Sequence, residues 1–90
     1  MVERRNKHEI VYDILNLISQ NNGKVKPTHI LYGGNLSNKR MKRYLNELIE
    51  KQFIQKTDEN GKVFYILTDK GRKFLEEFKK VNELITAFGI

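Results

Sequence analysis

The apolar positions between residues 37 and 51 repeat with the period of a helix. They recur at i, i+3, i+4, i+7 and i+8, which gathers them on one side of a helix. The five residues of this stripe are Met41, Tyr44, Leu45, Leu48 and Ile49. Ser37 stands where an N-cap belongs, because its hydroxyl can accept a hydrogen bond from a backbone N–H of the first turn. The pattern therefore predicts an amphipathic helix over residues 37–51.

Two helices are predicted upstream of this one. The first begins after Asn6, which with Glu9 has the spacing of a capping box, and it ends at Asn22-Gly23. The second covers residues 27–32, with a proline at its first position, where proline suits a helix. Gly33-Gly34-Asn35 then forms the turn into the amphipathic helix. Two helices joined by a short glycine-containing turn are typical of a helix-turn-helix.

After the amphipathic helix the apolar period changes from 3.6 to 2, which indicates strands. Residues 53–57 and 63–67 are the predicted strands, and Asp58-Glu59-Asn60-Gly61 is the predicted hairpin loop. This hairpin is the candidate wing, with residues 56–63 at its outer end. Both faces of the return strand are apolar, so we expect a second layer to cover the face that is turned away from the helices.

The last predicted helix covers residues 69–90 and carries an apolar seam. Thr68 stands at its N-cap. Apolar residues spaced by four and three follow the a and d positions of a coiled coil, and a body this small can cover only the first half of such a helix. The seam therefore predicts a homodimer whose interface contains Phe78, Val81, Leu84, Ile85 and Phe88. The alternative is that this helix packs against the first helix of the same chain.

Composition limits the class of protein. The 90 residues make one domain, and 17 Lys and Arg against 11 Asp and Glu give a net charge of +6. The pI near 9.7 is in the range of nucleic-acid-binding domains. The absence of cysteine excludes disulfides, thiolate metal sites and cysteine nucleophiles. No apolar run approaches the roughly 18 residues of a membrane span, and the N-terminus lacks the apolar region of a signal peptide, so we expect a soluble, cytoplasmic protein.

Two sequence blocks carry a family resemblance. Residues 27–37, PTHILYGGNLS, resemble the P-x-x-I-x-Y-x-A-N-L-S block of small archaeal winged-helix proteins, a family typified by the small basic "a" chromatin protein of the Sulfolobales. Residues 65–71, YILTDKG, resemble the Y-x-L-T-x-K-G join between wing and final helix in that family. The sequence departs from the family at Gly34, where alanine is usual, at Asn38, where an aromatic residue is frequent, and in a final helix that is shorter than usual.

The resemblance and the order of the predicted elements imply one fold. It is α+β and mainly helical: a winged helix-turn-helix of three helices, a two-stranded β-hairpin wing and a long C-terminal helix. Residues 1–90 then form a single winged-helix domain, with a basic arm at 1–5, a body at 6–68 and a dimerisation helix at 69–90. The family binds double-stranded DNA as a homodimer joined by a coiled coil of C-terminal helices. This implies that residues 37–51 form a recognition helix in the major groove.

Candidate DNA contacts follow from side-chain chemistry on that helix. Lys39, Arg43 and Asn46 are predicted in the groove, because Arg and Asn can contact guanine and adenine edges bidentately. Arg40, Lys42 and Ser37 suit phosphates, and Lys56 and Lys62 suit wing contacts to the backbone or minor groove. Which of these residues reads bases is left open. The expected role is a transcriptional regulator or a chromatin-associated protein.

Two other interpretations compete with DNA binding. The polar face of the 37–51 helix could be a solvated surface with Arg43–Glu47 and Glu47–Lys51 pairs, or the fold could serve as a protein–protein interaction module that does not bind DNA. No nucleophile and base can be assembled, so an enzyme is not expected. His8 and His29 lack further ligands nearby, so no metal or other cofactor is expected. The four tyrosines are predicted at the core or its edge: Tyr12, Tyr32, Tyr44 and Tyr65.

Overall fold

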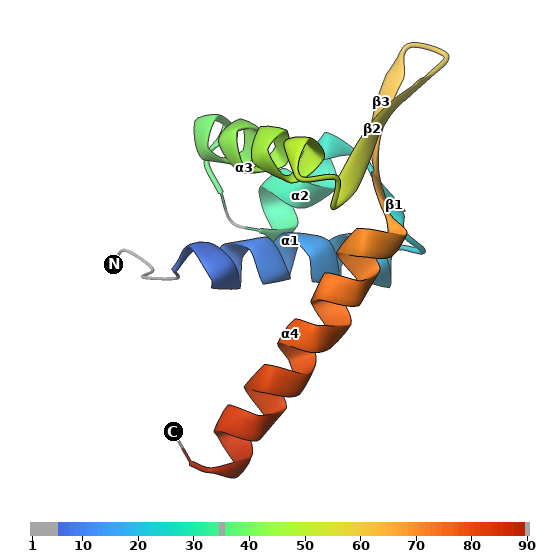
Figure 1. Cartoon of the computed structure of the whole chain (residues 1–90). Coiled ribbons are helices and arrows are strands. Elements are labelled where there is room, and N and C mark those ends of the chain that lie inside the picture. Colours follow the sequence, from blue (N-terminus) through green and yellow to red (C-terminus); the bar gives the residue numbers. More distant parts are fainter. Residues whose placement is uncertain (1–5, 35, 90) are drawn as a thin grey trace.

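The computed structural model describes residues 6–34 and 36–89, and it forms a mainly helical α+β winged helix (Figure 1). In chain order the elements are α1 (Lys7–Gln20), β1 (Lys24–Val25), α2 (Pro27–Gly33), α3 (Asn38–Glu50), β2 (Ile54–Glu59), β3 (Lys62–Leu67) and α4 (Asp69–Ala87). The predicted fold class is therefore confirmed. The predicted basic arm at 1–5, together with Asn35 and Ile90, lies outside the described residues.

Local capping signals set the ends of α1 as predicted. The Asn6 side chain accepts a hydrogen bond from the backbone N–H of Glu9 at 2.9 Å, and the Glu9 carboxylate accepts one from the backbone N–H of Asn6 at 3.4 Å. These two bonds complete a capping box. At the other end Asn22 and Gly23 both have positive φ, 63° and 80°, so the chain turns out of the helix there.

The sheet has three strands, one more than the hairpin predicted. Its order is β1-β3-β2, with both pairings antiparallel. The two residues of β1 pair with Tyr65 and Ile66 on the side of β3 that faces away from β2. A two-residue segment carries no readable period, so its partner strand could not be inferred from sequence.

The hairpin loop is shorter than predicted. The register pairs Asp58 with Val63 and Glu59 with Lys62, so the strands continue through two residues that had been assigned to the loop. Only Asn60 and Gly61 form the turn, with φ of 57° and 79°. Positive φ at both positions is the requirement of a two-residue type I′ turn, whose twist matches that of the paired strands. The predicted four-residue loop is therefore wrong, and the paired part of the wing is longer than predicted.

The core lies between α1, α3 and one face of the sheet. Its most deeply buried side chains are Ile14, Leu15, Ile18, Val25, Ile30, Leu45 and Ile54. Burial also raises the pKa of the Tyr65 phenol, as expected for a core side chain on β3. The opposite face of β3 carries half-buried Phe64 and Ile66. No second layer was found over it among residues 6–34 and 36–89; instead the Lys24 ammonium lies 4.5 Å from the centre of the Phe64 ring.

Helix α4 packs on the body only through its first half. Leu75 is buried, and the Phe78 ring stacks on Tyr12 of α1 with ring centres 5.1 Å apart. Phe74 lies between Phe53 and Phe78. Residues 79–89 are all exposed, and Figure 1 shows this half of α4 extending away from the rest of the molecule. The alternative of packing against the first helix of the same chain therefore holds for the first half of α4 alone.

Candidate nucleic-acid interface

Helix α3 is held by its cap and by its apolar stripe. The Ser37 hydroxyl accepts a hydrogen bond from the backbone N–H of Arg40 at 3.2 Å, which fixes the N-terminus as predicted. Met41, Leu45 and Leu48 are buried under the helix, at 4%, 1% and 3% exposure. A helix anchored along its whole underside cannot rotate about its axis, so its outer side chains point in a fixed direction.

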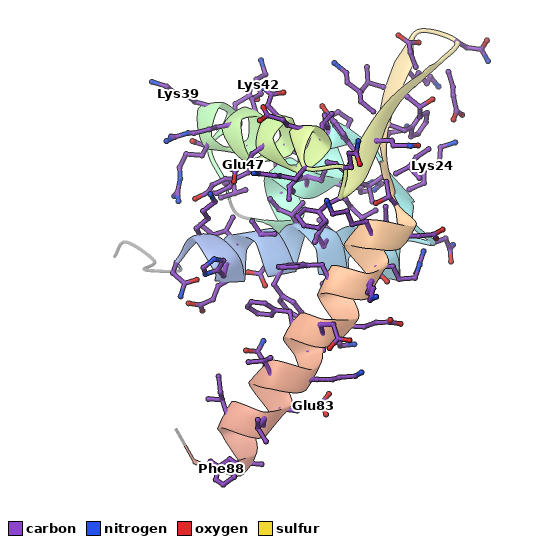
Figure 2. The ribbon with its side chains drawn as sticks, viewed as in Figure 1. Lys24, Lys39, Lys42, Glu47, Glu83 and Phe88 are labelled. Atoms are coloured by element: carbon purple, nitrogen blue, oxygen red, sulfur yellow. The ribbon has the colours of Figure 1, made fainter. Side chains whose placement is uncertain are left out.

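The outer face of α3 brings six of the predicted site residues together. All are exposed: Ser37, Lys39, Arg40, Lys42, Arg43 and Asn46. Figure 2 shows Lys39 and Lys42 projecting from α3 away from the body. Across residues 6–34 and 36–89, none of the four cations of this face forms an ion pair. We call this set the α3 basic face.

One carboxylate of α3, that of Glu47, is neutralised from another helix. Glu47 had been considered as a partner of Arg43 or Lys51, but its Oε2 lies 2.6 Å from Nζ of Lys7 on α1. Both side chains are partly exposed, at 38% and 55%, so the pair adds less than about 1 kcal/mol to stability. The pair matters more for the charge of this surface than for stability, because the Lys7 ammonium compensates the Glu47 carboxylate beside the cations of α3. It also links α1 to α3.

The two predicted wing cations do not lie together. In the strand register, Lys56 lies opposite Tyr65 and Lys62 lies opposite Glu59. Because side chains alternate along a strand, Lys56 shares a face with Ile54 and Tyr65, whereas Lys62 shares the opposite face with Phe64. Both lysines are exposed. A DNA backbone lying against one face of the wing would therefore meet one of them directly and the other only at its edge.

A third lysine on the wing was missed by the sequence reasoning. The Lys24 ammonium on β1 donates to both carboxylate oxygens of Glu59 at 2.7 Å, and it lies over the Phe64 ring. This contact crosses β3 and joins β1 to the tip of β2. It neutralises the carboxylate nearest the wing tip. No sequence signal could have found the pair, because its partners are brought together only by the three-stranded sheet.

The positions of Tyr32 and Asp58 can also be compared with the predictions from sequence. Tyr32 was predicted in the core or at its edge, but it is 79% exposed, because it lies on the side of α2 opposite the buried Ile30. The Asp58 carboxylate accepts a hydrogen bond from the backbone N–H of Gly61 at 3.0 Å, which agrees with its prediction as a turn residue.

In the described part of the chain no three His, Asp or Glu side chains gather as metal ligands, and no helix is long and apolar enough to span a membrane.

The fold and the matched sequence decide the family. Residues 4–86 match the family described as winged helix-turn-helix. The chain belongs to this family. Two uncharacterised proteins of Methanocaldococcus jannaschii are relatives of this winged helix-turn-helix chain: MJ0290 is 37% identical over 82 residues and MJ0287 is 27% identical over 84. The chain spans 36% of the length of the first and 80% of the second, and 91% and 93% of its own length is aligned.

Solved structures similar to this winged helix-turn-helix chain include DNA-binding proteins. Sso10a-2, a DNA-binding protein from Sulfolobus solfataricus, has a TM-score of 0.74 and 28% identity, with 94% of this chain and 90% of that chain covered. TubR from Bacillus thuringiensis, solved bound to 24 bp of tubC, has a TM-score of 0.67 and 22% identity, with 88% and 98% covered. The resemblance to the archaeal family inferred from the two sequence blocks is therefore confirmed.

Proposed function

We propose that this protein binds double-stranded DNA as a homodimer, with α3 in the major groove and the wing on the backbone, and acts as a transcriptional regulator or chromatin-associated protein of the nucleoid. The observation that carries the proposal is the α3 basic face: four cations and an amide on a helix fixed from below, with no competing ion pairs in the described chain. The similar Sso10a-2 is a DNA-binding protein, which supports it.

Roles within the α3 basic face follow from chemistry and position. We assign Lys39, Arg43 and Asn46 to base edges, because a guanidinium and a carboxamide can each make paired hydrogen bonds to one base. Arg40 and Lys42, with the Ser37 hydroxyl at the helix start, are assigned to phosphates. On the wing, Lys56 and Lys62 lie on opposite faces, so one of them contacts the DNA backbone or minor groove directly and the other contacts it only at the edge of the wing. The compensated Glu47 and Glu59 do not repel the phosphates as free carboxylates would.

Charge reversal on the α3 basic face tests DNA binding. With about five phosphates neutralised per subunit, log K is expected to fall with log salt at a slope of about −4 to −5. Lys39→Glu with Arg43→Glu removes two cations from the proposed groove face and adds repulsion between the new carboxylates and the DNA, so duplex affinity at low salt should fall by at least about 100-fold. Fluorescence anisotropy with a random-sequence duplex, repeated over a salt series, measures both quantities.

The matched control carries the same charge change on another helix. Lys73 and Lys79 are exposed on α4, so Lys73→Glu with Lys79→Glu gives the same net charge away from the proposed contact surface. Affinity retained by the control and lost by the α3 variant supports the proposed face. Equal losses would show that only net charge matters. No binding by the unmodified protein at micromolar concentration and low salt would favour the protein–protein interaction module instead.

The homodimer rests on the exposed apolar residues of α4. Val81, Leu84, Ile85 and Phe88 are 53%, 59%, 41% and 73% exposed. An apolar stripe of this kind on one helix is typical of a surface that associates with a partner, and a second copy supplies the same heptad spacing. Phe78 stands at the start of this stripe, half-buried against Tyr12. Its ring lies at the junction of the body and the proposed interface.

Light scattering tests the homodimer directly. Ile85→Asp with Phe88→Asp should reduce the mass from that of two chains to that of one, because two carboxylates would be buried without partners. Lys79→Asp changes the net charge by the same two units on the opposite side of α4 and should leave the dimer intact. A single-chain mass for the unmodified protein, or an unchanged mass for the first variant, would refute this interface.

A further inference from the structure

The start of α4 is attached to the end of α3 by backbone and side-chain contacts that the proposed function has not used. Figure 1 shows α4 beginning where α3 turns into β2. The contacts come from Thr68, Lys70 and Gly71 on one side and from Lys51, Gln52 and Phe53 on the other. We call these six residues the α3–α4 joint. The first three are the T-x-K-G part of the block that joins wing and final helix.

Lys70 caps the end of α3. Its Nζ donates a hydrogen bond to the backbone carbonyl of Lys51, the C-cap residue of α3, at 2.8 Å. It also lies 5.1 Å from the centre of the Phe53 ring. A cation at this end of a helix is favoured, because the last carbonyls carry the negative end of the helix dipole. One side chain of α4 thus contacts the last turn of the recognition helix.

Thr68 and Gly71 bring the two backbones into direct contact. The Thr68 hydroxyl lies 2.7 Å and 2.9 Å from the carbonyl oxygens of Gln52 and Phe53, and it accepts a hydrogen bond from the backbone N–H of Gly71 at 3.0 Å. The backbone N–H of Thr68 also donates to the Phe53 carbonyl at 3.1 Å. A Cβ at Gly71 would lie 2.1 Å from that same oxygen. No side chain fits there, because the first turn of α4 rests on the backbone of residue 53.

We propose that the α3–α4 joint fixes the angle between α3 and α4, so that the body of each subunit cannot pivot on the dimer helix. This inference rests on the proposed function: in a homodimer joined through α4, the angle sets the separation of the two recognition helices and hence the spacing of the half-sites that are bound. Lys70 and Gly71 are positioning residues, since neither belongs to the α3 basic face. A fixed angle raises the affinity for DNA that carries two half-sites, because two linked recognition helices strengthen binding only if both can reach their half-sites at once.

Distances within one chain test the joint independently of DNA. The sequence contains no cysteine, so Lys42→Cys on α3 and Lys80→Cys on α4 give two unique sites for spin labels. Labelled protein diluted with unlabelled protein reports the distance within one subunit by pulsed electron paramagnetic resonance. We expect one narrow distribution for the parent, a broader one for Lys70→Met, and a displaced one for Gly71→Ala. Lys70→Arg, which keeps a donor and a charge, should restore the narrow distribution.

Half-site spacing provides the second readout. In a pool of duplexes that carry two half-sites at varied separations, the parent should prefer one separation, and Lys70→Met should weaken that preference by about tenfold while binding to one half-site is unchanged. Lys73→Met removes the same charge from an exposed position two residues beyond the joint and should match the parent in both measurements.

The two measurements separate the joint from the function on which it rests. Unchanged distance distributions in both Lys70→Met and Gly71→Ala would overturn the joint, as would equal broadening in Lys73→Met. Lys70 is exposed and its loss should not unfold the chain, so this variant decides the matter even if Gly71→Ala fails to fold. If the parent binds no DNA, the proposed function fails, but the distances still decide whether the joint holds the angle.

Discussion

Helices α3 and α4 are both amphipathic, but they differ in what covers their apolar sides. The stripe of α3 is buried along its length, with Met41, Leu45 and Leu48 all inside the core. That of α4 is covered only as far as Phe78, and its later members are exposed. The same kind of pattern therefore marks two kinds of surface. On α3 the polar face is exposed, whereas on the second half of α4 the apolar face is exposed as well.

Truncation of one leucine in each helix should give the largest difference in the free energy of unfolding between α3 and α4. Leu45 is 1% exposed, so Leu45→Ala should lower the free energy of unfolding by about 2–5 kcal/mol through lost burial and a cavity. Leu84 is 59% exposed, so Leu84→Ala should change it by less than about 0.5 kcal/mol in protein diluted until light scattering gives the mass of one chain. Urea unfolding followed by circular dichroism measures both.

Protein concentration sharpens this comparison. If Leu84 is covered by a second chain, its truncation should become costly as concentration rises, while the cost of Leu45→Ala stays constant. A large loss for Leu84→Ala at every concentration would mean that a contact within the subunit covers this half of α4. That outcome would remove the contrast between the two helices.

Removal of the N-cap side chain from each helix should give a smaller difference in the free energy of unfolding. The Ser37 hydroxyl bonds only to the first turn of its own helix, so Ser37→Ala should cost about 1 kcal/mol. Thr68 caps α4, and its single O–H also donates to the carbonyls that follow α3, so Thr68→Ala should cost more, about 2 kcal/mol, because this hydrogen bond is lost together with the cap. Thermal unfolding of the two variants under identical conditions provides the test. Equal costs would argue that the contacts across the joint add no stability.

Features set by neighbouring residues were predictable. The capping box of Asn6 and Glu9, the cap at Ser37 and the exposed face of α3 each depend on spacings of three or four residues, which the sequence displays directly. The order of helices and the hairpin followed from changes of period. The two-residue turn was also within reach, because Asn-Gly is the sequence that a type I′ turn favours.

Features that depend on segments distant in sequence were not predictable. The Lys7–Glu47 pair requires that α1 and α3 lie side by side, and the Lys24–Glu59 pair requires that β1 lie across β3 from β2. The opposite faces of Lys56 and Lys62 depend on strand register, which the longer predicted loop obscured. The exposure of Tyr32 depends on which side of the short α2 faces the core, and seven residues do not show this by period.

The alternation of the wing limits how this hairpin can change length. Glu59 meets Lys24 only because it projects from the same side of the ribbon as Phe64. One residue added between Lys56 and the turn would send Glu59 to the reverse side and leave the lysine over an aromatic ring without its anion. Adding or removing one residue on each strand would also turn Glu59 to the reverse side. Two such pairs would restore the side but would move the carboxylate by about 7 Å along the strand, away from Lys24. Natural variation in this hairpin should therefore be concentrated in composition, with its length held fixed.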